Sequence, residues 1–556
     1  MEDKSGATRS ALRVWRFRAL VFAMTLAAAP MAASAAPGYT VLYTFTGAGD
    51  GGQPLGALLA DSKGNLYGTT SVGGEFGNGT VFELTPPASA GAPWKESVLH
   101  SFSGAEANSP QAGLTADSSG ALYGTTVGGG AFGFGTVFKL TPGVATKVLY
   151  SFKGQGRGLK DGANPYGGVI VDSDGNLYGM TFTGGDFGKG AVFKLAPNGA
   201  ETVLRSFSGR NGAYPLAGLI ADAAGNLYGA TTHGGASNNG VVFELAERPL
   251  FRAEMVIWQF SGGLDGRSPS ANLTFDSNGN LYGTTAHGGA YGLGSVFKVA
   301  ANGNSSFPLH SFAGVDGAHP SGNLIVDLAG NLYGTTPGDG ATNGTVFKIA
   351  PNGAITVLHY FEHKEQGDLP MAGLTADSNG NLYGTTVIGG ASRQGTVFEL
   401  TGTGFLAKPV PFNAILADLA IDFGKQPNTD SFNLTSQFFL GKTSPGIKPS
   451  TDAVSLAVGT FSTTLPAGSL KPNGSGAYQF AGTVNGVALQ IQLTPTGQQR
   501  YSLTAAARNA NLSGTSNPVS VTLTIGANTG TCSTTALIQR QTAQRESANT
   551  PNSLER

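Results

Sequence analysis

The sequence predicts an all-β protein, and three observations carry this prediction. A tetrapeptide Asn-Leu-Tyr-Gly, or a variant with one letter changed, occurs seven times, with 50 to 56 residues between successive tyrosines. Each copy lies among short runs of β-branched and aromatic residues separated by Gly, Asp and Asn turns. Glycine accounts for 86 of the 556 residues, as expected where tight turns join many short strands. A fixed period of this length indicates a repeat architecture. The seven tyrosines are Tyr67, Tyr123, Tyr178, Tyr228, Tyr282, Tyr333 and Tyr383.

One copy of the repeat contains four predicted strands. In the fourth copy they are residues 218–222, 226–232, 241–245 and 256–260, with a glycine-rich loop between the second and the third. Four short strands per period match one blade of a β-propeller. A single blade cannot bury either of its faces, so the blades must pack against one another.

The two ends of the repeat array predict how it closes. Residues 41–45 resemble the fourth strands of the other repeats, and the last repeat stops after its third strand, residues 396–400. We therefore expect the N-terminal strand to complete the last blade, which leaves few open edges. The prediction is a seven-bladed β-propeller over residues 36–403.

The N-terminus predicts export. Arg9, Arg13, Arg16 and Arg18 precede an apolar run that starts at Ala19, and Ala33-Ser34-Ala35 has the form of a signal-peptide cleavage site. Residues 1–35 are predicted to be a signal peptide. The mature protein is then expected to be secreted or periplasmic and not to insert into the membrane after cleavage. Association with the cell surface is left open.

The C-terminal part has a different pattern. Residues 404–527 are predicted to be an immunoglobulin-like β-sandwich of about seven strands, because apolar and polar residues alternate from Asp430 to Gly526. Residues 528–556 are polar and are expected to be a disordered tail. The single cysteine, Cys532, lies in this tail; it is expected to be an unpaired thiol, with an intermolecular bridge as the alternative.

The repeat unit resembles a known family. The pattern Gly-Leu-x-x-Asp-x-x-Gly-Asn-Leu-Tyr-Gly-Thr-Thr, followed by Gly-Gly and by Gly-Thr-Val-Phe-Lys-Leu, resembles the GloVer-type tandem repeat of exported bacterial proteins over residues 40 to 400. The resemblance implies a repeat joined to a variable C-terminal surface anchor, and it carries no established catalytic residue. The C-terminus departs from that pattern, with neither an apolar anchor nor a sortase-like motif.

The charge balance limits the partners. The formal net charge is −1 and there is no basic run, so nucleic acid and anionic membranes are not expected partners. A monomer without a cofactor is expected. The repeated Asp-x-x-Gly-Asn turns invite a calcium interpretation, but an aspartate that opens a tight hairpin accepts backbone N–H bonds, which favours a scaffold role.

Residues that break the repeat are the candidates for chemistry. His233 and His287 precede Gly-Gly in the fourth and fifth repeats, His319 lies in the loop that enters the sixth, and Asp265 and Asp316 lie in neighbouring loops. Histidines with carboxylates bind metals or move protons. The alternative is that these are ordinary exposed loop residues.

Aromatic residues in the same loops suggest a sugar-binding surface. Phe132, Phe134, Phe187 and Tyr291 lie in glycine-rich loops, and Tyr166 lies in the long loop from 153 to 167. Exposed rings beside polar side chains suit sugars, which need stacking and hydrogen bonds together. The alternative is that the rings are buried between blades.

The expected function is that of an exported, non-catalytic protein which binds a glycan or a protein partner at the cell exterior. The second hypothesis is a secreted lyase or hydrolase acting on carbohydrate or a small molecule, with its site near the propeller axis. No nucleophile motif, metal signature or cofactor fingerprint favours the enzyme.

Overall fold

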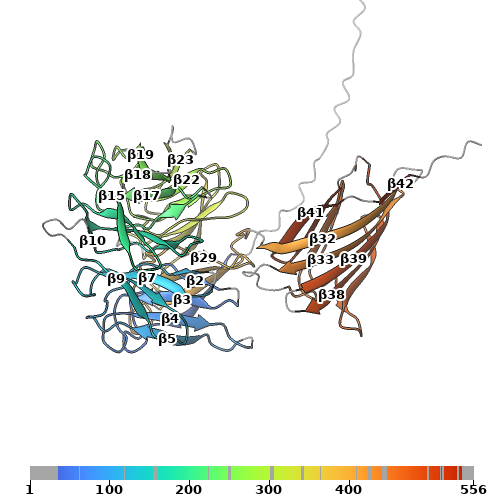
Figure 1. The fold of residues 1–556 in the computed structure, drawn as a ribbon, viewed down its shortest axis with the longest axis horizontal. Coiled ribbons are helices and arrows are strands. Elements are labelled where there is room, and N and C mark those ends of the chain that lie inside the picture. The colour runs from blue at the N-terminus through green and yellow to red at the C-terminus, as the bar shows by residue number, and fades with distance from the viewer. Residues whose placement is uncertain are drawn as a thin grey trace, which may run out of the picture. The chain divides into compact units, whose positions relative to one another are not determined.

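The structure is a computed structural model, and every element that it describes is a β-strand (Figure 1). It describes residues 36–540 except 62, 90, 118, 155–160, 223, 248–251, 301–305, 340–342, 363–364, 408–409, 424–427, 441–446, 498–499, 514, 516–518 and 535–536. Within these ranges there is no helix of the length and apolarity that a membrane span requires. The predicted signal peptide, residues 1–35, lies outside them.

The seven repeats form seven antiparallel sheets, coloured blue to yellow in Figure 1. In each, a two-residue strand pairs with the strand that carries the Leu-Tyr-Gly motif, which pairs with the Val-Phe strand and then with a fourth strand. The first four sheets comprise β2 (Leu59–Ala60), β3 (Leu66–Thr70), β4 (Thr80–Thr85) and β5 (Lys95–Ser101); β6 (Thr115–Ala116), β7 (Leu122–Thr126), β8 (Thr136–Leu140) and β9 (Lys147–Ser151); β11 (Ile170–Val171), β12 (Leu177–Thr181), β14 (Ala191–Leu195) and β15 (Glu201–Ser206); and β16 (Ile220–Ala221), β17 (Leu227–Thr231), β18 (Val241–Glu247) and β19 (Arg252–Gln259). The other three comprise β21 (Thr274–Phe275), β22 (Leu281–His287), β23 (Ser295–Val299) and β24 (Ser306–Ser311), with β20 (Arg267–Pro269) also on β22; β25 (Ile325–Val326), β26 (Leu332–Thr336), β27 (Thr345–Ile349) and β28 (Ile355–Tyr360); and β29 (Thr375–Ala376), β30 (Leu382–Thr386) and β31 (Thr396–Thr401). A small extra pair joins β10 (Gly162–Ala163) to β13 (Thr183–Gly184).

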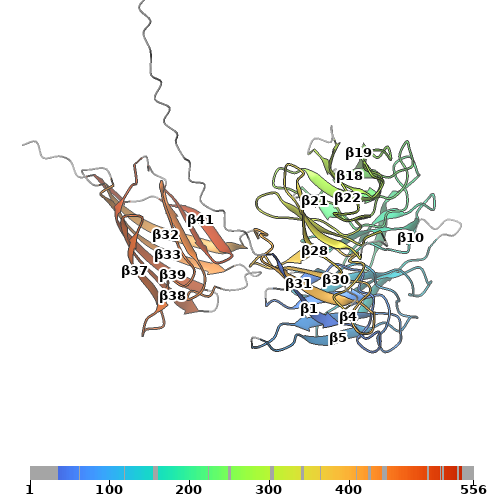
Figure 2. The same cartoon turned by 180° about the vertical axis from the view of Figure 1, so that it is seen from behind.

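The seventh sheet is completed by the N-terminal strand, as predicted. Strand β1 (Gly38–Thr44) runs antiparallel to β31, with Val41 opposite Phe398 and Thr44 opposite Thr396 (Figure 2). Phe45, which follows β1, is fully buried. The chain thus pairs residues more than 350 positions apart, and β31 has no open edge along this stretch.

The hydrophobic cores lie between successive sheets. Tyr178, Met180 and Val192 of the third sheet pack with Leu227 and Phe243 of the fourth, and the equivalent positions repeat along the chain. Tyr383 and Val397 of the last sheet pack with Phe45, Leu66 and Phe82 of the first. The packing contacts are therefore cyclic, because the last sheet covers the first.

The repeated aspartates hold the hairpin between the first two strands of each sheet. Asp172 accepts the N–H groups of Asp174 and Asn176 through Oδ1, and the Asn176 amide and the Tyr178 hydroxyl through Oδ2. Burial opposes the ionisation of Asp117, but hydrogen bonds from Ser119, Tyr123 and Ala121 outweigh it and lower the pKa to about 2. A lowered pKa means that the stability from this carboxylate is present above about pH 4 and is lost as the pH falls toward 2. These contacts favour the scaffold role over calcium.

The carboxyl group of Glu201 is expected to change the stability with pH in the direction opposite to that of Asp117. Glu201 in β15 is partly buried, its Oε1 has no hydrogen-bond partner among the described residues, and burial together with nearby Asp161 raises its pKa to about 7. An unfolded glutamate titrates near pH 4.3, so this site costs stability as the pH rises from about 4.3 through 7. We expect Glu201→Gln to stabilise the protein by about 1–2 kcal/mol at pH 8, after discounting for solvent screening, and by little at pH 5. Calorimetric unfolding at both pH values measures this; Glu75→Gln, at an exposed loop position, is the control, and an equal effect of Glu201→Gln at both pH values contradicts the argument.

The C-terminal part differs from its prediction in the number and extent of its strands. Its described residues form eleven, drawn orange to red in Figure 1: β32 (Val410–Phe423), β33 (Asp430–Leu440), β34 (Val454–Val458), β35 (Phe461–Leu465), β36 (Lys471–Pro472), β37 (Tyr478–Val484), β38 (Val487–Gly497), β39 (Arg500–Ala510), β40 (Val519–Ile525), β41 (Asn528–Thr534) and β42 (Leu537–Arg540). Leu434 and Leu489 share one core with Leu456 and Val521.

The disordered tail predicted from residue 528 is wrong for residues 528–534 and 537–540. Strand β41 pairs with β40, where Val521 lies opposite Cys532, and β42 pairs in parallel with β32. Pairing with an existing sheet edge satisfies the backbone even where the side chains are polar, which composition alone does not reveal. Residues 541–556 lie outside the described ranges.

Candidate functional site

The loops between second and third strands and the loops that enter each repeat form one continuous layer. Gly52 bridges to Val72 within the first repeat, and the N–H of Gln53 donates to the Gln394 carbonyl of the last repeat at 2.7 Å. The same link joins Tyr214 to Lys189 and His319 to Leu293. We call this layer the loop face.

Each repeat places a left-handed residue directly before a proline on the loop face. The proline is seven residues before the hairpin aspartate in every repeat. Left-handed backbone is costly for residues other than Gly, Asn and Asp, at about 1 kcal/mol or more. The residues with this conformation are Gln53, Ser109, Asn164, Tyr214, Ser268, His319 and Leu369.

Two of these residues take part in ring contacts. The Tyr214 ring lies 5.3 Å from Phe182 and 5.8 Å from His233, and Phe182 lies 5.3 Å from Tyr166, all between ring centroids. Thr232 donates to the Tyr214 carbonyl at 2.6 Å, which holds the strand end beside the loop. We call Tyr166, Phe182, Tyr214 and His233 the aromatic arc. His233 is exposed and the other three are partly exposed.

The second left-handed residue in ring contact, His319, pairs with His287. Their ring centroids are 5.0 Å apart, and His319 Nδ1 lies 2.8 Å from the Ala286 carbonyl, which fixes the ring. Burial, then the positive charges of His319 and Arg267, lower the pKa of His287. The structure thus brings together two of the three predicted histidines, while His233 contacts Thr232 and Tyr214. In the described residues, no group of three or more His, Cys, Asp or Glu side chains is placed to hold a metal ion.

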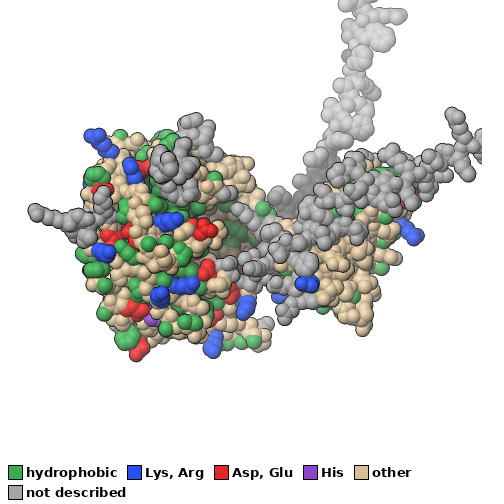
Figure 3. Space-filling model, in the orientation of Figure 1, with side chains coloured by type: hydrophobic (Ala, Val, Ile, Leu, Met, Phe, Trp, Pro, Cys, Tyr) green, Lys and Arg blue, Asp and Glu red, His purple; other side chains and the backbone are tan. Residues whose placement is uncertain are grey.

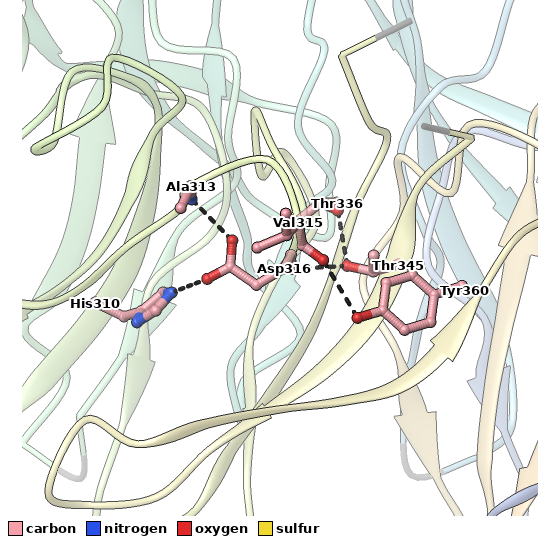
Figure 4. A network of polar contacts seen from close by, with 7 residues as sticks. All are labelled: His310, Ala313, Val315, Asp316, Thr336, Thr345 and Tyr360. Atoms are coloured by element: carbon pink, nitrogen blue, oxygen red, sulfur yellow. Dashed lines mark hydrogen bonds and ion pairs between the residues drawn. The ribbon is translucent and has the colours of Figure 1, made fainter. Parts of the chain in front are cut away.

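The two predicted aspartates are engaged within their own loops. Asp316 accepts the Ala313 N–H at 2.8 Å and lies 2.7 Å from His310 Nε2, as Figure 4 shows. Asp265 accepts the N–H and hydroxyl of Ser261. Asp50 makes the equivalent contacts in the first repeat, where it accepts the Thr46 N–H. These carboxylates recur because each one caps the turn after a fourth strand.

The remaining predicted aromatic residues are exposed, so the alternative that they are buried between sheets is wrong. The exposed fractions are 52% for Phe132, 40% for Phe134, 58% for Phe187 and 66% for Tyr291. Part of the long loop near Tyr166, residues 155–160, lies outside the described residues. No ring contact joins these four rings to the aromatic arc among the described residues.

A cavity of about 120 Å³ is lined by all seven repeats. Its wall consists of the residues that follow each proline, and we call it the central cavity. Gly167 shows why small residues lie here, because a Cβ on it would lie 2.3 Å from the Ala217 carbonyl oxygen. Tyr166 belongs both to this wall and to the aromatic arc. The residue directly after each proline lines the cavity, and these residues are Leu55, Gln111, Tyr166, Leu216, Ser270, Ser321 and Met371.

Sequence reasoning missed Phe182, Tyr214 and the central cavity. The sequence signal that could have indicated them is the X-Pro dipeptide at a fixed distance from each hairpin aspartate. The side chain before the proline varies between repeats, while its left-handed backbone conformation is the same in all seven. On the face shown in Figure 3, acidic and basic side chains are interspersed, as in the sequence, which has no basic run.

Comparisons with solved structures give matches of low identity. The extracellular domain of a candidate one-component system from B. thetaiotaomicron is 13% identical with a TM-score of 0.42, and the alignment covers 92% of this chain and 59% of that one. A luciferin-regenerating enzyme is 13% identical with a TM-score of 0.35, covering 67% and 97%. A candidate oxidoreductase (glucose dehydrogenase) from Thermus thermophilus is 15% identical with a TM-score of 0.32, covering 66% and 99%.

The chain thus spans 59% of the length of the first of these structures. No curated protein matches the sequence. The model of the Gloeobacter/Verrucomicrobia repeat matches residues 28–158, 90–255 and 250–453, which together span all seven Leu-Tyr-Gly strands. With more than half of its length matched, the chain belongs to the family of Gloeobacter/Verrucomicrobia repeat proteins.

Proposed function

We propose that this protein is an exported, seven-bladed β-propeller, residues 36–403, followed by an accessory β-sandwich. The cyclic packing of the seven sheets and the pairing of β1 with β31 support the propeller. The core shared by Leu434, Leu489, Leu456 and Val521 supports two packed layers of strands. The basic and apolar N-terminal pattern supports export to the periplasm or the exterior.

The proposed activity is carbohydrate binding on the loop face. The observation that carries it is the aromatic arc, a row of partly exposed rings that leads directly into the central cavity through Tyr166. Aromatic faces cover the C–H surfaces of a sugar ring, while nearby polar groups bind its hydroxyls. A row of rings beside a small cavity fits a saccharide better than a protein partner, because a protein interface needs a larger apolar patch.

The backbone supports selection of these side chains for a role beyond folding. Tyr214 and His319 adopt left-handed conformations that Asn or Gly would adopt at lower cost. Asn164 occupies the same position in the third repeat, so the fold accepts the less strained residue. Gln53, Ser109, Ser268 and Leu369 adopt the same conformation, so the rings that Tyr214 and His319 place on the loop face, and not the strain alone, support a binding role.

This argument gives a test with a matched control. We expect Tyr214→Asn to leave the melting temperature close to that of the wild type, because relief of strain offsets lost packing, while sugar affinity falls about fivefold to tenfold. Leu369→Asn relieves the same strain in the seventh repeat, outside the arc, and should retain full affinity.

The measurement is a glycan array with the mature protein, followed by titration of the best ligand against both variants. Binding of a glycan that is equally tight to the wild type and to Tyr214→Asn would remove the arc from the site. An array with no bound glycan would overturn the carbohydrate proposal, and a protein partner would then be sought.

The second candidate is a lyase or hydrolase, and the paired histidines favour it. His287 and His319 lie together on the loop face beside Arg267, and a neutral His287 at pH 7 follows from its lowered pKa. A neutral imidazole can accept a proton from a sugar. Release of unsaturated or reducing ends from any bound glycan, abolished by His287→Ala, would establish this activity.

A further inference from the structure

Six of the seven repeats contribute a residue at one equivalent position to the wall of the central cavity. This position is the third residue after the proline, and its occupants are Ala57, Gly113, Gly168, Gly218, Asn272, Asn323 and Gly373. Two of these occupants are asparagines. Asn272 Oδ1 accepts the Gly218 N–H at 2.6 Å, and Asn323 Oδ1 accepts the Asn272 N–H at 2.8 Å. An asparagine therefore accepts the N–H of the equivalent residue in the preceding repeat.

Five repeats lack such an acceptor. In these repeats the equivalent residue of the next repeat is glycine or alanine, which has no side-chain acceptor. The N–H groups concerned donate no hydrogen bond within the described residues, and they belong to Asn323, Gly373, Ala57, Gly113 and Gly168. All five residues line the central cavity; Asn272, whose N–H is occupied by Asn323, also lines it, and Gly218, whose N–H is occupied by Asn272, does not. The two asparagines supply in two repeats what a bound acceptor would supply in the other five.

The wall of this cavity also holds an unpartnered hydroxyl and several backbone carbonyls. Ser270, on its wall, has a buried hydroxyl oxygen without a hydrogen-bond partner among the described residues. Three carbonyl groups of the same wall accept a hydroxyl group of the preceding repeat. These pairs are Thr69 to Ala112, Thr125 to Gly167 and Thr335 to Ala372. Gly373 is buried, whereas Ala57, Gly113, Gly168 and Asn323 are partly exposed, so water or a bound group can accept these N–H groups.

A carboxylate fits these requirements. Ionised, it only accepts hydrogen bonds and has about four acceptor positions, whereas water and hydroxyl groups must also donate. Convergent backbone N–H groups bind anions without a basic side chain. A volume of about 120 Å³ leaves room for a carboxylate group.

We propose that the central cavity binds a carboxylate and that the sugar on the aromatic arc is acidic, of the uronate type. This rests on the proposed carbohydrate binding, because Tyr166 connects the two parts of the site. The ring of the sugar lies against the arc, and its carboxylate accepts the free N–H groups. Charge-assisted hydrogen bonds of this kind then distinguish acidic from neutral sugars.

Acetate tests the cavity without any knowledge of the sugar. In the mature protein labelled with ¹⁵N-glycine, the amide signals of Gly113, Gly168 and Gly373 are expected to move downfield and saturate as acetate is added at constant ionic strength. Acetamide, a neutral molecule of the same shape, should have no such effect. Gly120, in a turn where a Cβ would meet no atom within 4 Å, is the internal control.

The matched variant fills the cavity with a side chain that the fold already uses. Ala57→Asn is expected to accept the Gly373 N–H as Asn272 accepts that of Gly218, to retain the melting temperature, and to abolish the acetate shifts. Ala224→Asn is the control, since asparagine occupies the equivalent turn position at Asn278 and Asn379. On the glycan array, Ala57→Asn should bind the acidic sugar at least about tenfold more weakly.

The outcomes separate the two proposals. Acetate shifts with preference for uronates over their carboxyl-reduced forms support the inference. Acetate shifts without any glycan binding support the cavity and overturn carbohydrate binding. Glycan binding that ignores the carboxylate, or the absence of saturable acetate shifts at the three glycines, overturns the inference.

Discussion

Deletion of residues 36 to 46 is expected to destabilise the repeat array severely and to make it aggregate. The deletion removes β1, which pairs with β31 from Gly38 to Thr44, and Phe45, which is fully buried between the last sheet and the first. Loss of a buried phenylalanine alone costs about 3–5 kcal/mol. The deletion also exposes β31 as an edge strand that can pair with other molecules. Thermal unfolding and light scattering measure both effects.

Three further samples make this test specific. Phe45→Ala should produce the stability loss without the open edge, and Thr40→Ala, at an exposed position of β1, should change little. A peptide of residues 36–46 added to the truncated protein should restore part of the melting temperature by strand addition. Unchanged stability after the deletion, with no aggregation, would rule out closure by β1.

The second large effect is expected from Asp327→Ala. Asp327 is 3% exposed and accepts the Asn331 N–H and amide at 2.8 Å and the Tyr333 hydroxyl at 3.1 Å. Removal of the carboxylate takes the acceptor away from these donors in a buried hairpin, so we expect a loss of about 2–4 kcal/mol in the free energy of unfolding. Denaturant unfolding measures the loss.

Asp174→Ala serves as the control for that substitution. Asp174 is exposed in the turn of the most calcium-like repeat, and its side chain accepts no hydrogen bond among the described residues, so a change of less than about 0.5 kcal/mol is expected. Calcium and chelators should leave the melting temperature of the wild type unchanged. A calcium-dependent increase, or a negligible effect of Asp327→Ala, would show that the hairpin carboxylates are not purely structural.

Much of the repeat array could be predicted because its determinants are local. The Leu-Tyr-Gly and Val-Phe segments are runs of buried residues bounded by turn residues, and the hairpin aspartate Asp172 accepts hydrogen bonds from groups at most six positions away. Even the long-range pairing of β1 with β31 was predictable, because an incomplete repeat at each end leaves one partner for the other. The polar strands β41 and β42 were missed because their pairing depends on an available edge, which composition does not encode.

The candidate site was only partly predictable, because its geometry comes from residues in different repeats. The pairing of His287 with His319 was within reach, since both loops were expected on one face. The cap role of Asp316 was not, because its bond to His310 follows from a turn that the sequence does not specify.

By itself, the sequence determined seven similar all-β repeats, their closing strand and the role of the hairpin aspartates, because these depend on patterning and on contacts close in the chain. The tertiary structure decided which side chains meet on the loop face and which N–H groups of Ala57, Gly113 and their equivalents find no acceptor among the described residues. Whether an N–H group has an acceptor depends on which residues lie beside it in the folded chain. Asn272 and Asn323 act as acceptors because the preceding repeat lies beside them, and that proximity is a property of the folded array.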